Sequence, residues 1–329
     1  MSTRVVFSLR IFWFCRQSNS KLNHPKFLYS CLSEFTVCRK LGNTTINKKR
    51  QTPAEYCAET LRKCDYENYL ATLLLPQESR SAAMVIRAFN TEIAQVKDMV
   101  STTHAGAMRI QFWKDTLEQT FQGQPPQQPI ALELARILKY QKLTKVWFQR
   151  MVDSRESLFS ETGHQTIEEL EDYAERSVSS VYYLILQSMG IKDLQCDHAA
   201  SHLGKCQGIT NLLRGVPFNA SRGRVYLPTD VLIKHKVSQE QILQGSQEKS
   251  VIDVVYEIAS LAHQHLETAR SFKKDVPPAA RVVFLPAVAC ESYLKKLQEA
   301  KFCVSHPQLQ QRNGRLPLIL WWHKLKRTF

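Results

Sequence analysis

Apolar residues recur at helical spacing through most of the chain. In the segment 79–100 they stand four, four, three and four positions apart, at Val85, Phe89, Ile93, Val96 and Val100. This spacing places them on one face of a long helix. The same period predicts further helices over 105–122, 130–141, 144–159, 166–188, 193–215, 250–273 and 279–303.

Local signals indicate where some of these helices begin and end. Thr52-Pro53-Ala54-Glu55 combines a capping hydroxyl, a proline suited to the first turn and a glutamate three residues after the cap. It predicts a helix that runs through Tyr69, and Pro76 opens the next one. The proline-rich stretch 123–129 is typical of a loop. Apart from a short turn at 224–228 we find no β-alternating run of useful length, so the predicted fold class is all-α.

The composition fits one folded domain behind a basic leader. Of the 329 residues, 43% are hydrophobic and 22% are charged, which allows a sizeable core. Residues 1–50 carry ten Lys and Arg against one acid, Glu34, and so hold most of the formal net charge of +14. A nucleic-acid binder would cluster its basic residues on the folded body, so we predict no nucleic-acid partner. We assign 1–50 to a leader and linker and 51–329 to one helical domain.

The leader has the features of a mitochondrial presequence. Arg4, Arg10 and Arg16 are spaced among apolar residues and hydroxyls, with almost no acid. A secretory signal is an alternative, because Val5–Cys15 is largely apolar, although Arg10 interrupts it. Nuclear import through residues 48–50 is a weaker alternative. The nine cysteines include no C-x-x-C pair, which suits a reducing compartment such as the mitochondrial matrix.

The C-terminal segment 315–327 changes from apolar to basic. It contains Trp321 and Trp322 between a Leu/Ile run and several cations. This composition suits a peripheral contact with a membrane surface. A last helix whose Leu/Trp face packs on the core is equally compatible with the pattern. No run of 18 apolar residues exists, so no membrane-spanning helix is predicted.

Four segments together resemble the squalene and phytoene synthase family. They are, in order along the chain, Ile86–Asp98, Arg109–Asp115, Tyr173–Ser180 and Ile209–Pro228. The first and last are similar to the two aspartate-rich helices of the family, and the last is the strongest match. The resemblance covers roughly residues 55–300. It implies the isoprenoid synthase fold, a single helical domain around a central pocket.

Family members join two allylic diphosphates with the help of Mg²⁺. Two Asp-x-x-x-Asp motifs hold the metal, because carboxylates at i and i+4 share one helix face. Here the first pair of positions is Ala94 and Asp98, and the second is Gly215 and Asn219. Glycine offers no ligand, and a neutral amide is a poor anchor for a hard dication. The resemblance therefore implies a pseudoenzyme of the prenyl transferase class, with no catalytic residues, no metal and no cofactor.

The sequence also leaves open a residual binding pocket and a substitute metal site. Tyr173, Asn211, Arg214, Arg222 and Arg224 match family positions, which implies a residual pocket for a lipid, a prenyl diphosphate or another anion. Alternatively, the three arginines hold helix ends and the following loop through hydrogen bonds. A substitute metal site is a further alternative, and its acids would be Glu92, Asp98 and Asp115. A metal site at His198 and His202 lacks an evident third ligand.

Two hypotheses for function follow from the family resemblance. A mitochondrial branch of the family has degenerate aspartate motifs. A resemblance to this branch implies that the protein is a non-catalytic assembly factor for respiratory complex I, the NADH dehydrogenase. Such a factor acts early on a membrane-arm core subunit at the matrix face of the inner membrane, with complex I subunits or other assembly factors as partners. The alternative is an active prenyl transferase, or a lipid-binding or lipid-modifying enzyme, with a non-standard metal site.

Overall fold

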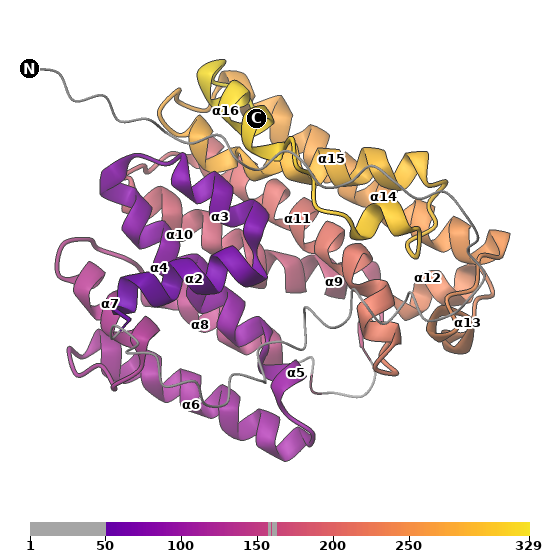
Figure 1. The fold of residues 1–329 in the computed structure, drawn as a ribbon, viewed down its shortest axis with the longest axis horizontal. Helices are drawn as coiled ribbons and strands as arrows, with labels where there is room; N and C mark the ends of the chain where they lie inside the picture. The colour runs from indigo at the N-terminus through magenta and orange to yellow at the C-terminus, as the bar shows by residue number, and fades with distance from the viewer. Residues whose placement is uncertain (1–50, 157–158, 160–162) are drawn as a thin grey trace, which may run out of the picture. The chain divides into compact units, whose positions relative to one another are not determined.

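The computed structural model describes residues 51–156, 159 and 163–329 (Figure 1). Within these ranges the regular elements are helices, which are joined by turns and loops. The predicted leader and linker, residues 1–50, lie outside this range. The first helices are α2 (Pro53–Cys64), α3 (Tyr66–Leu73), α4 (Gln77–Ala94), α5 (Val96–Met99), α6 (Thr103–Phe121), α7 (Pro129–Leu138) and α8 (Lys145–Glu156). The others are α9 (Ile167–Ala174), the π-helix η4 (Glu175–Ser179), α10 (Ser180–Ser188), α11 (Leu194–Ala220), α12 (Thr229–Lys234), α13 (Gln239–Leu243), α14 (Lys249–Ser271), α15 (Pro286–Glu299), α16 (Leu316–Leu325) and the short 3₁₀ helices η5 (Phe272–Lys274), η6 (Arg281–Phe284) and η7 (Pro307–Gln310).

The predicted all-α class is confirmed, and the first helix begins as predicted. The Thr52 hydroxyl accepts from the Glu55 N–H at 3.2 Å, and the Glu55 carboxylate accepts from the Thr52 N–H at 2.9 Å. The prediction that this helix continues to Tyr69 is wrong. Asp65 leaves the helical conformation with φ −143°, and its carboxylate accepts from the Asn68 side chain at 3.0 Å. The helix therefore breaks at Asp65, and α3 begins there without a side-chain cap hydrogen bond.

Several other boundaries differ from the periodic pattern. The predicted helix 79–100 is interrupted at Gln95, which separates α4 from α5. The predicted helix 166–188 is three elements, because the π-helix η4 separates α9 from α10. Helix α11 extends to Ala220 and contains Pro217, whereas the pattern predicts its end at 215. The apolar stripe of the first long helix is buried as predicted at Val85, Phe89, Ile93 and Val96.

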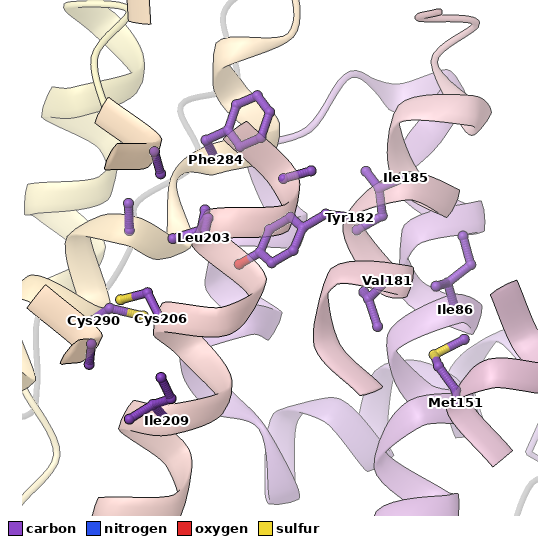
Figure 2. Packing of buried hydrophobic residues seen from close by; sticks show 14 of the residues in the cluster. Ile86, Met151, Val181, Tyr182, Ile185, Leu203, Cys206, Ile209, Phe284 and Cys290 are labelled. Atoms are coloured by element: carbon purple, nitrogen blue, oxygen red, sulfur yellow. The ribbon is translucent and has the colours of Figure 1, made fainter. Parts of the chain in front are cut away.

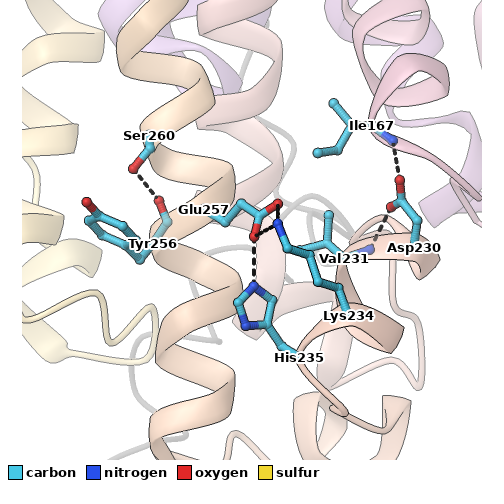
Figure 3. A network of polar contacts seen from close by, with 8 residues as sticks. All are labelled: Ile167, Asp230, Val231, Lys234, His235, Tyr256, Glu257 and Ser260. Carbon is cyan, nitrogen blue, oxygen red and sulfur yellow. Dashed lines mark hydrogen bonds and ion pairs between the residues drawn. The ribbon is translucent and has the colours of Figure 1, made fainter.

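Two short helices, α12 and α13, were not predicted. Charged groups hold α12 between α9 and α14 (Figure 3). Glu257 of α14 pairs with Lys234 at 2.8 Å and with His235 at 2.7 Å. Asp230 accepts from the N–H of Ile167, the first residue of α9, at 3.2 Å. The partners lie far apart in the sequence, so a local pattern gives no sign of them.

Helix α11 lies at the centre of the packing. It contacts α9, α10, α14, α15 and the π-helix η4. Figure 2 shows its residues Leu203, Cys206 and Ile209 among buried side chains of the neighbouring helices. Cys57, Cys196, Cys206 and Cys290 are buried free thiols. None of the described helices is both long and apolar enough to cross a membrane.

Two glycines let α11 approach η4 closely. A Cβ built on Gly204 would lie 2.5 Å from the Cα and 2.6 Å from the N of Ser179. A Cβ on Gly208 would lie 2.5 Å from the Cβ of Ala174. The Ser179 hydroxyl donates across this contact to the Ser201 carbonyl at 3.1 Å. The obstacle at Gly204 is main chain, so a side chain there can be accommodated only by moving a helix.

We expect Gly204→Ala to lower the free energy of unfolding by about 2 kcal/mol or more, because its methyl group overlaps the Ser179 backbone. Gly215→Ala in the same helix is the matched control. Its Cβ meets only the mobile Asn219 amide at 3.2 Å, and alanine favours helix by up to about 1 kcal/mol. Urea denaturation followed by circular dichroism measures both. Equal stability of the two variants would contradict the close contact.

Candidate functional site

The two degenerate motifs lie at the end of α4, in α5 and near the end of α11. Ala94 is the exposed last residue of α4, and Asp98 lies in α5 beyond the interruption at Gln95. The first pair of positions is therefore not carried by one continuous helix. Gly215 and Asn219 lie one turn apart on α11, where an added Cβ at 215 would be 3.2 Å from the Asn219 amide nitrogen.

The remaining acid, Asp98, is bound by the basic loop after α11. Arg224 donates to the Asp98 carboxylate at 3.0 Å and to the Lys97 carbonyl at 3.2 Å. The Arg222 Nε lies 3.9 Å from the same carboxylate oxygen and the Arg222 guanidinium 3.7 Å from the Phe218 ring centroid. A carboxylate that already accepts from a guanidinium group has part of its charge compensated, which makes it a weaker ligand for a metal ion. The site is thus an ion pair where the family resemblance implies a metal centre.

The turn that aims these arginines is fixed by the end of α11. Gly223 adopts φ +68°, a conformation that favours glycine. Its N–H donates to the Ala220 carbonyl at 2.9 Å, and the Arg224 N–H donates to the Asn219 carbonyl at 3.0 Å. This is the Schellman pattern that ends many helices. The chain therefore reverses after Arg222 and brings Arg224 back toward α5.

Tyr173 and Arg224 belong to one polar group, which also includes Tyr226. Burial raises the pKa of the Tyr226 hydroxyl, Arg224 opposes the rise, and Asp98 and Tyr173 add to it. Tyr173 itself is half-buried, with the Arg155 guanidinium 5.6 Å and the His164 ring 5.1 Å from its ring centroid. The structure thus brings Tyr173 and Arg224 together with Asp98.

The other predicted pocket residues take different places. Arg214 pairs with Glu67 of α3 at 2.9 Å and lies 4.8 Å from the ring centroid of Tyr293 of α15. Burial lowers the pKa of Arg214, but Glu67 outweighs this, so the pKa is raised and the pair stays charged. Asn211 is exposed on α11. Arg214 therefore serves a contact outside the group around Asp98.

Arg155 of α8 is a site residue that the sequence pattern does not reveal. It is 5% exposed, and it donates to Asn90 of α4 at 2.8 Å and to the Ser154 hydroxyl at 2.9 Å. Burial lowers its pKa, while Tyr173 raises it. An arginine in the last turn of an amphipathic helix is normally solvated, so only the tertiary contact with Asn90 and Tyr173 distinguishes this one.

The acids of the alternative metal site have separate partners. Glu92 accepts from the Tyr56 hydroxyl, and Asp115 accepts from the Gln111 side chain at 2.8 Å. His198 and His202 both stack on the ring of Phe272, and the Nδ1 atom of His202 lies 2.9 Å from that of His265. Within the described ranges no three His, Cys, Asp or Glu side chains gather as metal ligands. The residues at the two motifs do not fit a magnesium–diphosphate cluster.

A small apolar cavity of about 200 Å³ lies beside the end of α11. Val216, Pro217 and Ala220 form one wall, and α13, α14 and the segment 302–305 form the others. None of the five predicted pocket residues lines it. The cavity and the polar group around Asp98 are therefore separate features of the same helix end.

A profile of the squalene/phytoene synthase family matches residues 61–322. The chain belongs to the squalene/phytoene synthase family. A dehydrosqualene synthase solved in complex with a ligand has the same fold, with a TM-score of 0.71 and 16% identity; the match covers 83% of this chain and 95% of that one.

Two close relatives carry names of a different kind. The chain is 51% identical over 274 residues to a Homo sapiens protein named NADH dehydrogenase (ubiquinone) complex I, assembly factor 6, a match that spans 83% of this chain and 82% of that one. It is 40% identical over 283 residues to the Drosophila melanogaster homolog, with 84% of each chain covered. The family is described by a synthase activity, whereas these relatives are named for the assembly of complex I.

A double-mutant cycle of Asp98→Asn and Arg224→Gln tests the ion pair. We expect a coupling of about 0.5–1 kcal/mol in the free energy of unfolding, because the two side chains are partly exposed, and the coupling should fall as salt is added. The matched cycle of Asp98→Asn with Arg222→Gln should give less, since that distance is 3.9 Å. Urea denaturation at two salt concentrations measures both cycles. A coupling near zero for Arg224 would argue against the pair.

Proposed function

We propose that this protein is a non-catalytic assembly factor for respiratory complex I. It acts early, on a membrane-arm core subunit at the matrix face of the mitochondrial inner membrane, together with complex I subunits or other assembly factors. The observation that carries the proposal is the ion pair of Asp98 with Arg224, in a chain half identical to proteins named complex I assembly factor 6.

The charge of the site supports a role without catalysis. Departure of a diphosphate requires cations that neutralise the growing negative charge. In this chain Asp98 is occupied by Arg224, while Gly215 and Asn219 provide no carboxylate. The arginines alone could attract an anion, but Asp98 already provides their counter-charge. The site therefore has no spare acid with which to hold a dication.

The interior also argues against a bound prenyl chain. Arg87 of α4 is 4% exposed, and its guanidinium lies 5.7 Å from the ring centroid of Tyr182. The Tyr182 hydroxyl donates to Gln207 at 2.6 Å, and Gln207 donates to Asn68 at 3.2 Å. Hydrogen-bonded polar groups thus connect α3, α10 and α11 through the core. A prenyl chain placed against them would break these bonds without replacing them.

Helix α16 supports a peripheral contact with the membrane. Leu316 and Leu320 are buried against α3 and α15, as expected for a last helix that packs on the core. The other face exposes apolar side chains at i, i+3, i+4 and i+7: Leu318, Trp321, Trp322 and Leu325. The buried face agrees with the interpretation that this helix packs on the core, and the exposed face supports the proposed membrane contact. We assign the exposed face to the surface of the inner membrane.

Incubation with Mg²⁺ and farnesyl or geranylgeranyl diphosphate tests the absence of catalysis. We expect no release of diphosphate above the level without protein, because the carboxylates that hold the metal are missing. A dehydrosqualene synthase assayed in parallel is the positive control. Turnover that is abolished by Asp98→Ala would refute the proposal and support the alternative, an active prenyl transferase with a non-standard metal site.

Complementation tests the assembly role. Cells that lack the protein should contain less assembled complex I on native gels and should synthesise squalene normally. Wild type and Asp98→Ala should restore complex I alike, since the acid has no catalytic task. Trp321→Ser/Trp322→Ser should restore it poorly, because the exposed face of α16 is altered. Normal complex I in the deleted cells would rule out the role.

A further inference from the structure

A basic hollow of about 480 Å³ lies between the end of α14 and helix α16. Arg270 and Lys273 line it from the α14 side, and Trp322, His323 and Lys326 line it from α16. Thr328 and Phe329 close it from the end of the chain. None of these residues belongs to the group around Asp98 or to the degenerate motifs.

Packing and hydrogen bonds define the walls of the hollow. The Thr328 N–H donates to the His323 carbonyl at 2.9 Å, and the Thr328 hydroxyl lies 3.0 Å from the His323 ring nitrogen. Phe329 is buried with its ring centroid 5.0 Å from that of Phe284. Arg270 is held by Glu291 at 2.5 Å and by Glu267 at 3.3 Å. Contacts within the protein itself therefore hold the walls of the hollow in place.

Two lysines of the hollow have no acidic partner in the described part of the chain. Lys273 forms no ion pair there. Lys326 lies 4.5 Å from the Trp322 ring centroid, a cation–π contact that leaves its ammonium group without a counter-ion. Arg270 is neutralised by its glutamates, so the uncompensated charge of the hollow comes from Lys273 and Lys326. Such a site attracts an anion.

His323 responds to this positive potential. Burial lowers the pKa of its imidazole, and Glu291 opposes the change. Arg270, Lys273 and Lys326 each lower the pKa further. The imidazole therefore stays neutral at physiological pH and can offer a hydrogen bond without adding charge. The potential at the centre of the hollow is positive although Glu291 lies nearby.

Trp322 joins the hollow to the exposed apolar face of α16. It lines the hollow and is also the third member of the stripe Leu318, Trp321, Trp322 and Leu325. Tryptophan at a membrane surface lies at the level of the headgroups, with apolar residues deeper and cations toward the lipid phosphates. Lys273 and Lys326 line the hollow together with Trp322, and Leu318 and Leu325 lie in the apolar stripe that also contains Trp322. Trp322 thus has cations in one group of neighbours and apolar side chains in the other. An acidic protein segment would match the charge but would leave the Leu/Trp stripe uncovered.

We infer that the hollow binds the phosphodiester headgroup of an anionic phospholipid while the apolar stripe of α16 enters the lipid surface. The inference rests on the proposed membrane contact of α16 and assigns it a chemical specificity. The phosphate would lie between Lys273 and Lys326, and the His323 ring could donate a hydrogen bond to it. Binding should therefore depend on anionic lipid and not merely on any bilayer.

Vesicle flotation of the full chain tests the inference. The probes are vesicles of phosphatidylcholine alone and vesicles in which about one lipid in five is phosphatidylglycerol. We expect Lys273→Ala/Lys326→Ala to lower the partition coefficient on the anionic vesicles about 30-fold, because each cation near such a surface contributes about fivefold. The matched control is Lys139→Ala/Lys142→Ala, which removes two exposed lysines at the end of α7 and should change it less than about twofold.

The outcomes separate this inference from the membrane proposal. If the wild type floats with both vesicles equally and the two double variants behave alike, the headgroup site is refuted but the membrane contact stands. If the wild type floats with neither vesicle, both fail, and an acidic protein partner becomes the better explanation. Millimolar inorganic phosphate should not displace the protein; displacement would identify a site for free phosphate instead. Thermal melts of all variants check that the fold is intact.

Discussion

The close contact between α11 and the π-helix η4 determines how the other helices can pack. At Gly204 the two backbones approach so closely that a methyl group would overlap Ser179. Because α11 also contacts α9, α10, α14 and α15, fixing it against η4 fixes the frame of the domain. The far end of the same helix carries Gly215, Asn219 and the turn at Gly223. The position of the degenerate motif thus depends on a contact three turns away.

Backbone hydrogen bonds and one ion pair hold the loop at the end of α11. The turn after α11 keeps its shape through Gly223 and backbone hydrogen bonds, which need no metal ion. The arginines that follow need a counter-charge, and Asp98 supplies it directly. An ion pair within the chain can therefore hold a loop that would otherwise present unpaired cations.

The exposed surface of α16 shows how such a scaffold can acquire another use. Leu316 and Leu320 fasten the helix to α3 and α15, and this packing holds Trp321 and Trp322 outward. A rigid helix that presents aromatic side chains loses little conformational entropy when it binds a surface. The neighbouring hollow of Lys273 and Lys326 adds charge at the same end of the molecule. The hollow and the exposed face of α16 share no residue with the group around Asp98.

Sequence periodicity determined the helical class, the buried stripe of α4 and the cap at Thr52, because these follow from neighbours within a few residues. The four family segments indicated the squalene/phytoene synthase family, and the match over residues 61–322 confirms it. The short helix α12 and the burial of Arg155 were decided by partners distant in the sequence, such as Glu257 and Asn90. The same holds for the pairing of Asp98 with Arg224, for the placement of Arg214 beside Glu67, and for the two faces of α16. A periodic pattern reports which side chains share a face, and only the packed structure decides what each face meets.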